Sequence, residues 1–125
     1  MKNRIEIFNY LHDTGISNLS FDFPNKKVSI DFLFWDDIQQ KEVILKTVFS
    51  GVSKFNSEYS QNINFNVIGC HDANCEVVTE NQYKVTFLFD FLKQAVAWKV
   101  EINFENLELE GGLSKEAFDY KFKRA

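Results

Sequence analysis

Two consecutive runs between residues 82 and 104 alternate apolar and polar positions. The apolar positions are Tyr83, Val85, Phe87, Phe89 and Phe91 in the first run and Val96, Trp98, Val100, Ile102 and Phe104 in the second. Alternation of this kind, with β-branched and aromatic residues on one side, predicts paired strands that each bury one face. We expect a β-hairpin that reverses at 92–94. Because two strands alone are not stable in water, the rest of the chain must add strands or a covering helix.

The same alternation predicts further strands at 16–23, 28–34, 43–49 and 63–67. Pro24 ends the first of these, and a hairpin turn at 24–26 joins it to the second. A polar loop at 36–40 joins the second to the third. Leu33 and Trp35 make the second strand apolar on both faces, which indicates a strand that is central or partly covered. Ile44 and Val48 do the same for the third, which is expected to be buried.

The middle of the chain is less regular. We expect residues 50–56 to form a connection and residues 70–80 to form an edge strand or a loop. Asparagine lines one face of the predicted strand at 63–67, at Asn62, Asn64 and Asn66. We interpret this face as solvated, and a polar recognition surface is the alternative.

The two ends of the chain carry weaker patterns. Residues 5–12 have apolar positions at helical spacing and predict a short helix or an extended arm. At residues 105–106 the alternation slips by one position, which predicts a bulge or bend. Ser114 is the candidate N-cap of a C-terminal helix. The whole pattern predicts a mainly β fold, an antiparallel β-sandwich or partly open barrel of about six to eight strands with a C-terminal helix.

Composition narrows the class of protein. A chain of 125 residues fits a single domain, 1–125, and its 14 Phe, 4 Tyr and 2 Trp suit the pleated faces of sheets. The net charge of −4 argues against a nucleic acid partner and favours a basic protein partner. The first ten residues lack an apolar run of signal-peptide length, and no segment is apolar enough to span a bilayer. We therefore expect a cytoplasmic protein with no membrane partner.

Both histidines of the chain precede an aspartate, in His12-Asp13 and His71-Asp72. Together with Cys70 or Cys75 they would supply groups that ligate metals. Their spacing matches no common zinc pattern, and turn aspartates beside partly buried histidines are the simpler interpretation. We expect no metal and no other cofactor. The cysteines are expected to be ordinary thiols, although a Cys70–Cys75 disulfide is possible if the segment between them folds back.

Motifs of enzyme chemistry are absent. The chain has no Gly-x-Ser-x-Gly segment, and its glycines, at 15, 51, 69, 111 and 112, form no phosphate-binding loop. Trp35 and Trp98 lie in apolar runs, where core packing is the expected role. We expect no catalytic residues, so the protein is predicted not to be an enzyme.

Several short segments occur in a suggestive order. They are Leu-His-Asp-Thr-Gly-Ile-Ser-Asn-Leu at 11–19, Val-Phe-Ser-Gly-Val-Ser-Lys-Phe at 48–55, Asn-Ile-Asn-Phe at 62–65 and a late strand rich in Phe and Glu. This order resembles the small bacterial immunity proteins of polymorphic toxin systems, of the Immunity protein 50 type. Residues 70–81 and 111–125 have no counterpart in that pattern. The resemblance implies stoichiometric binding of a cognate toxin domain without catalysis.

We therefore expect a non-catalytic binding protein, an immunity protein that binds and neutralises a basic toxin domain. The candidate contacts are four acidic residues expected to be exposed, Asp36, Asp37, Glu58 and Glu80. One alternative is a small ligand-binding or metal-binding β-barrel, or an enzyme, that uses the two His-Asp pairs. Another is a structural subunit of a larger assembly.

Overall fold

The computed structural model describes residues 5–12, 14–59, 69–90 and 96–111. In these residues the chain forms a 3-10 helix and eight strands: η1 (Glu6–Tyr10), β1 (Gly15–Asp22), β2 (Lys27–Asp36), β3 (Lys41–Ser50), β4 (Lys54–Tyr59), β5 (Gly69–Thr79), β6 (Gln82–Asp90), β7 (Val96–Phe104) and β8 (Asn106–Gly111). Every strand pair is antiparallel, and the sheet has the order β4-β7-β6-β5-β1-β2-β3-β8. The predicted mainly β, antiparallel class is confirmed.

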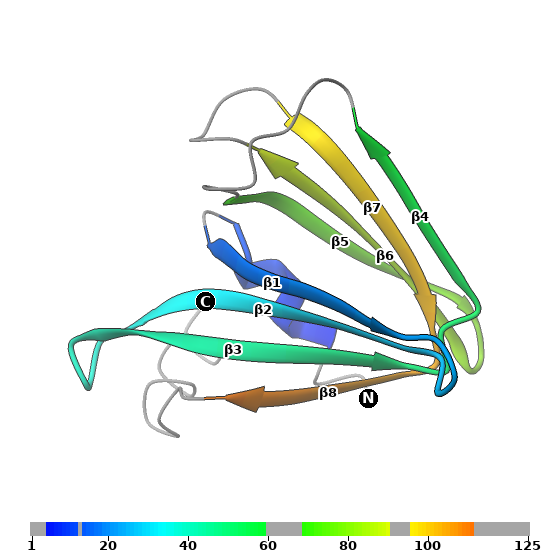
Figure 1. Ribbon diagram of the computed structural model, residues 1–125, viewed down its shortest axis with the longest axis horizontal. Helices are drawn as coiled ribbons and strands as arrows, with labels where there is room; N and C mark the ends of the chain where they lie inside the picture. Colours follow the sequence, from blue (N-terminus) through cyan, green and yellow to red (C-terminus); the bar gives the residue numbers. More distant parts are fainter. Residues whose placement is uncertain (1–4, 13, 60–68, 91–95, 112–125) are drawn as a thin grey trace.

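This open sheet is folded into two layers. We call them the β2 layer (β1, β2, β3 and β8) and the β6 layer (β4, β5, β6 and β7). Only Gly15 and Gly69 pair β1 with β5, and beside them the Cys70 N–H donates to the Thr14 carbonyl at 2.7 Å. The layers meet where β3 leads into β4 and β7 into β8, and they diverge toward the other end (Figure 1). The predicted sandwich or partly open barrel is thus one open sheet, and β4 and β8 are its outermost strands among the described residues.

The hydrophobic core lies between the two layers and is built mainly from phenylalanine. Phe8 of η1 reaches both layers, with its ring centroid 6.1 Å from Phe49 of β3, 5.8 Å from Phe87 of β6 and 6.5 Å from Phe104 of β7. All four rings are buried. The ambiguous N-terminal segment is therefore a short helix, and the hairpin of β6 and β7 supplies much of the core, as its alternation predicts.

The chain crosses between the layers twice at the closed end. Gly51 follows β3 with a φ of +62°, a left-handed conformation that favours glycine. A Cβ atom there would lie 2.8 Å from the side chain of Glu105. Glu105 makes the return crossing between β7 and β8, and its N–H donates to the Ser50 carbonyl at 3.0 Å. The bend predicted at 105–106 is confirmed: it lets Phe104 and Leu107 both point into the core from different layers.

The turn between β1 and β2 lies where the sequence predicts it. Asp22, the last residue of β1, accepts hydrogen bonds from the backbone N–H of Asn25 at 3.4 Å and from its side-chain amide at 2.8 Å. Lys26 closes the turn with a φ of +54°. Phe23 and Pro24 form the exposed tip between them.

The turn between β2 and β3 repeats this arrangement around a buried aspartate. Asp36, the last residue of β2, accepts hydrogen bonds from the backbone N–H of Gln39 at 3.0 Å, from its side-chain amide at 2.8 Å and from the Ile38 N–H at 2.9 Å. Gln40 closes the turn with a φ of +55°. The two aspartates differ in exposure, because Asp22 is exposed and Asp36 is fully buried.

The structure corrects several sequence predictions. The predicted connection at 50–56 contains the start of β4, which alternation does not mark because most of its residues are polar. Residues 70–80 belong mostly to β5, which pairs along its length with β6 but with β1 only at Gly69. β2 and β3 are central strands of the sheet, as predicted. Their outer face is covered only in part, and Trp35 is 49% exposed on it, so the predicted core packing of Trp35 is wrong. Trp98 is buried as predicted.

Three predictions lie outside the described residues. They are the strand with Asn62, Asn64 and Asn66, the reversal at 92–94, and the C-terminal helix that begins at Ser114. The described part of the chain contains no helix with the length and apolar character that crossing a membrane requires.

Candidate functional site

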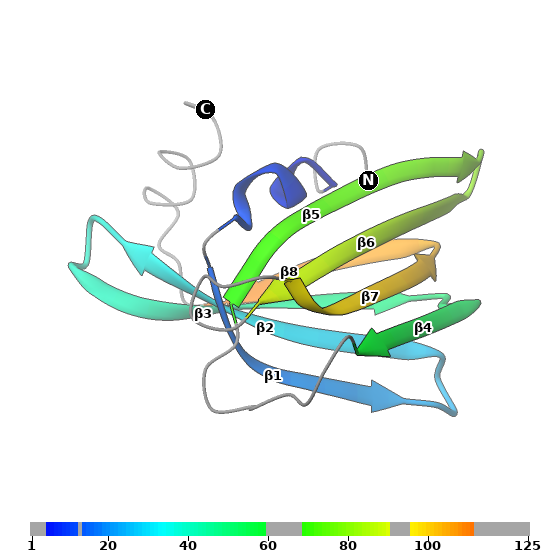
Figure 2. The same ribbon diagram turned by 90° about the horizontal axis from the view of Figure 1, so that it is seen from above.

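The four acidic residues predicted as contacts do not form one surface. Asp36 is fully buried and holds its turn, so the prediction that it is exposed is wrong. Asp37, Glu58 and Glu80 are exposed, but they lie in the β2–β3 turn, in β4 and in the β5–β6 turn. These two turns are at opposite ends of the molecule (Figures 1 and 2). The adjacent pair Asp36-Asp37 thus divides into one structural and one exposed carboxylate.

The two histidines, in contrast, are brought together. The rings of His12, which follows η1, and His71, in β5, have centroids 5.8 Å apart. The Nδ1 atom of His71 lies 3.4 Å from Oδ2 of Asp90, a buried carboxylate at the end of β6. Such a carboxylate orients an imidazole. Sequence reasoning missed Asp90, because the pairing of β5 with β6 places it there.

The aspartates that adjoin the histidines in the sequence do not complete this cluster. Asp72 accepts a hydrogen bond from the Ala73 N–H at 2.9 Å through its Oδ1 atom, a local backbone role. Asp13 lies outside the described residues. Across residues 5–12, 14–59, 69–90 and 96–111, no group of three or more His, Cys, Asp or Glu side chains is arranged to hold a metal ion.

Cys70 and Cys75 are free thiols on the same strand. Five residues of β-strand span about 16 Å, whereas a disulfide needs Cα atoms within about 7 Å. The possible Cys70–Cys75 disulfide is therefore excluded in this fold. Burial, with a smaller contribution from Glu76, raises the pKa of the Cys75 thiol to about 11. A thiol with so high a pKa is a poor nucleophile at neutral pH.

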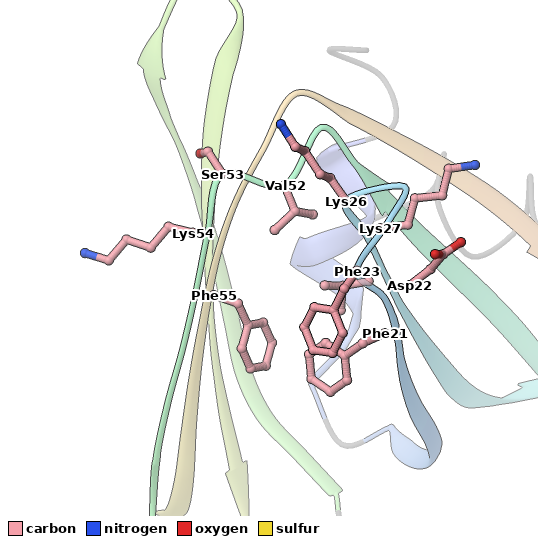
Figure 3. A pocket seen from close by; sticks show the side chains of 10 residues that line it. Phe21, Asp22, Phe23, Lys26, Lys27, Val52, Ser53, Lys54 and Phe55 are labelled. Atoms are coloured by element: carbon pink, nitrogen blue, oxygen red, sulfur yellow. The ribbon is translucent and has the colours of Figure 1, made fainter.

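An open pocket of about 160 Å³ lies between the β1–β2 turn and the first residues of β4. Its apolar side is an aromatic cluster that we call the edge cluster: Phe21, Phe23 and Phe55. Phe21 stacks on Phe23, with centroids 5.5 Å apart, and meets Phe55 edge-on at 4.8 Å. In Figure 3 the ring of Phe55 points from β4 toward the other two rings, below Val52. Phe21 remains 43% exposed and Phe23 80% exposed.

The chain crossing at the closed end fixes the two walls of this pocket. The Val52 N–H donates to the Lys26 carbonyl at 3.0 Å, which ties the crossing to the β1–β2 turn. The next N–H, that of Ser53, donates to the Asn103 carbonyl in β7 at 3.0 Å. Consecutive backbone groups therefore hold the two layers at a set separation. We expect the pocket to be preformed, because both walls are anchored by backbone hydrogen bonds.

The rim of the pocket is basic although the whole chain is acidic. Lys26, Lys27 and Lys54 line it together with one acidic residue, Asp22. In Figure 3 the Lys26 and Lys27 ammonium groups point outward from the β1–β2 turn, whereas Lys54 extends from the side of β4 opposite the Phe55 ring. Within the described residues no ion pair engages these lysines, and the Asp22 carboxylate already accepts the hydrogen bonds of its turn. The local charge is thus opposite in sign to the net charge of −4.

Sequence analysis did not identify this pocket. One signal was present: the alternation of Leu19, Phe21 and Phe23 continues past the end of β1 at Asp22 and places an aromatic residue in a turn. The contribution of Phe55 depends on the crossing to β4 and has no local signal. Comparisons with protein-family models, with curated proteins and with solved structures gave no match.

Proposed function

We propose that this chain is a non-catalytic binding protein that neutralises a partner protein by covering part of its surface, as the immunity proteins that it resembles do. The proposal keeps the bacterial, cytoplasmic setting that the sequence leads us to expect. One observation carries the binding role: Phe21 and Phe23 of the edge cluster are exposed beside an open pocket, whose opposite wall carries the partly buried Phe55. Exposed aromatic groups with a polar rim are typical of sites where proteins dock.

The size of the pocket favours a protein partner over a free ligand. Pockets for drug-sized ligands and cofactors measure about 300–1,000 Å³, whereas this pocket measures about 160 Å³. A cavity of about 150 Å³ accommodates one benzene ring. The space therefore suits one anchor side chain, and anchors of this kind contribute much of the affinity of protein interfaces.

The proposed contact surface differs from the acidic one expected from the sequence. Asp36 is buried and does not contribute. Asp37, Glu58 and Glu80 stay candidate contacts as separate exposed charges, and at such distances their role would be to steer the partner rather than to anchor it. The anchor is assigned to the edge cluster.

Affinity capture from the host's lysate, read by mass spectrometry, tests this function. We expect the full chain to retain one stoichiometric partner and Phe23→Ala to retain about tenfold less of it, because an anchor contact is lost. Val77→Ala, which truncates another exposed apolar side chain, in β5, is the control and should capture the partner normally. The binding role is contradicted if repeated captures with the full chain retain no partner, or if both variants behave alike.

A second candidate function rests on the pair of histidines. Because His12 and His71 lie side by side, with His71 next to Asp90, they could bind a small ligand or a metal ion, or act as a general base. A titration with Zn²⁺, followed through the histidine ring signals by NMR, tests it. Saturable changes at both rings in the full chain, absent in His71→Ala, would favour this function. Unchanged ring signals would remove its metal-binding form.

A further inference from the structure

The charge around the edge cluster specifies what kind of partner segment can bind there. A group inserted between Phe23 and Phe55 meets aromatic rings on two sides and the side chain of Val52 on a third (Figure 3). An aromatic ring in such a space makes both stacked and edge-on contacts. These contacts stabilise binding beyond the free energy gained from burying the ring. The pocket volume of about 160 Å³ limits the inserted group to about one ring.

The residues that flank the inserted ring must face the lysine rim. Lys26, Lys27 and Lys54 line the pocket, and each carries its ammonium on a flexible four-carbon stem that can follow a carboxylate; Lys54 would have to reach round the edge strand β4 to do so. A basic flanking residue would be repelled by these three lysines. A neutral flanking residue would form no ion pair with them. Carboxylates on both sides of the ring complement the rim.

We propose that the partner binds through an acidic segment that inserts one aromatic side chain into this pocket, between carboxylates that pair with Lys26, Lys27 and Lys54. The proposal rests on the protein-binding function proposed above and adds the chemistry of the partner. It also predicts that the contact is local, because the rest of this chain is acidic and repels an acidic segment that misses the pocket.

Single-stranded nucleic acid is the main competing occupant, because it too combines aromatic rings with negative charge. Proteins that bind it track several nucleotides along a basic groove. Here the pocket accepts one ring, only three lysines line it, and the chain carries a net charge of −4. These features favour the acidic protein segment.

Three short peptides test the proposal on the full chain by NMR of its backbone amides. They are acetyl-Asp-Phe-Glu-amide, the neutral acetyl-Asn-Phe-Gln-amide and the ringless acetyl-Asp-Ala-Glu-amide. We expect the first to shift the amides of residues 26–28 and 52–55 at millimolar concentration. The other two should bind about tenfold more weakly, and added salt should weaken only the charged peptides.

Two substitutions separate the ring from the rim. Phe23→Ala should reduce the affinity for the Phe peptides about tenfold, whereas Lys26→Gln combined with Lys54→Gln should make the acidic and neutral Phe peptides bind equally. Lys41→Gln, at the start of β3, removes an exposed lysine remote from the pocket and should change neither affinity.

Equal binding of all three peptides, shifts elsewhere in the chain, or stronger binding of hexathymidylate than of acetyl-Asp-Phe-Glu-amide would overturn the proposal. If no peptide binds at the pocket but Phe23→Ala still captures less of the partner than the full chain does, the proposed partner chemistry is wrong and the binding function stands. If the full chain also captures no partner, both proposals are wrong.

Discussion

Two clusters of phenylalanine in this protein have the same side chains and opposite surroundings. Phe8, Phe49, Phe87 and Phe104 form a core cluster in which every ring is buried. The edge cluster of Phe21, Phe23 and Phe55 has ring contacts that are as close, yet Phe23 is 80% exposed. Contact between aromatic rings therefore does not distinguish a core from a binding surface. What distinguishes them is whether the opposite layer covers the rings.

The position of each cluster in the sheet explains the difference. Phe87 and Phe104 belong to β6 and β7, which have neighbours on both sides, and η1 places Phe8 against them. Phe55 belongs to β4, an edge strand, and Phe23 lies in a turn beyond the end of β1. No further strand among the described residues covers that side of the fold. We infer that the fold buries its aromatic residues where strands are central and presents them where strands end.

The largest expected difference between the two clusters is in stability, and one alanine substitution in each cluster tests it. Phe87→Ala should lower the free energy of unfolding by about 3–5 kcal/mol, because it leaves a cavity among Phe8, Phe49 and Phe89. Phe23→Ala should change it by less than about 0.5 kcal/mol, because the ring is already exposed. Urea unfolding followed by tryptophan fluorescence measures both values.

A loss as large as about 5 kcal/mol can unfold a domain of this size. Phe87→Leu keeps most of the side-chain volume and should cost less than about 1.5 kcal/mol, so it extends the series if the alanine variant does not fold. Similar losses for substitutions at positions 23 and 87 would show that the edge cluster is part of the core.

The two aspartate turns provide a second test of how burial changes the contribution of the same side chain to stability, with a smaller expected effect. Asp36→Ala should cost about 1–3 kcal/mol, because it removes a buried carboxylate that accepts three part-buried hydrogen bonds. Asp22→Ala removes the corresponding turn contacts where water can replace them and should cost less than about 0.5 kcal/mol. Asp36→Asn keeps an acceptor oxygen, so its cost in the free energy of unfolding should lie between the costs of the two alanine substitutions. Equal costs for the two alanine variants would contradict the difference in burial.

The smallest expected effect on stability comes from ion pairs, and it is tested by comparing lysines with and without such a pair. Hydrogen bonds from Lys84 at 3.0 Å and Lys99 at 3.2 Å lower the pKa of Glu101 below its ordinary value of 4.5. Because the folded pKa is the lower one, this contribution to stability is present above pH 4.5 and is lost as the pH falls through the folded pKa. Wild-type unfolding midpoints should thus fall more steeply with acid than those of Glu101→Gln.

The matching lysine substitutions complete that test. Lys84→Gln removes an ion pair on the outer face of the β6 layer and should lower the unfolding midpoint slightly at pH 7. Lys54→Gln removes a rim lysine without an ion pair to the described residues and should leave the midpoint unchanged. A clear loss of stability in Lys54→Gln would mean that the rim serves the fold rather than a partner.

The sequence predicted most of the strands and the class of the fold. The inward positions of β2, β6 and β7, the turn at 24–26 and the bend at Glu105 all follow from the two-residue period of a strand and from turn chemistry. It missed β4, because a short polar edge strand has no apolar face to mark it. It also treated Asp36 and Asp37 alike, although only one of them is buried.

Local sequence is enough to set which residues alternate, where the chain turns and which side chains point to the same face, because these properties depend on neighbours a few residues apart. What covers each face depends on how the sheet folds. The tertiary structure placed His12 beside His71, aligned Asp90 with that pair, buried Asp36 and left the edge cluster open beside three lysines. Those outcomes depend on the fold of one sheet into two layers, which joins residues far apart in the chain.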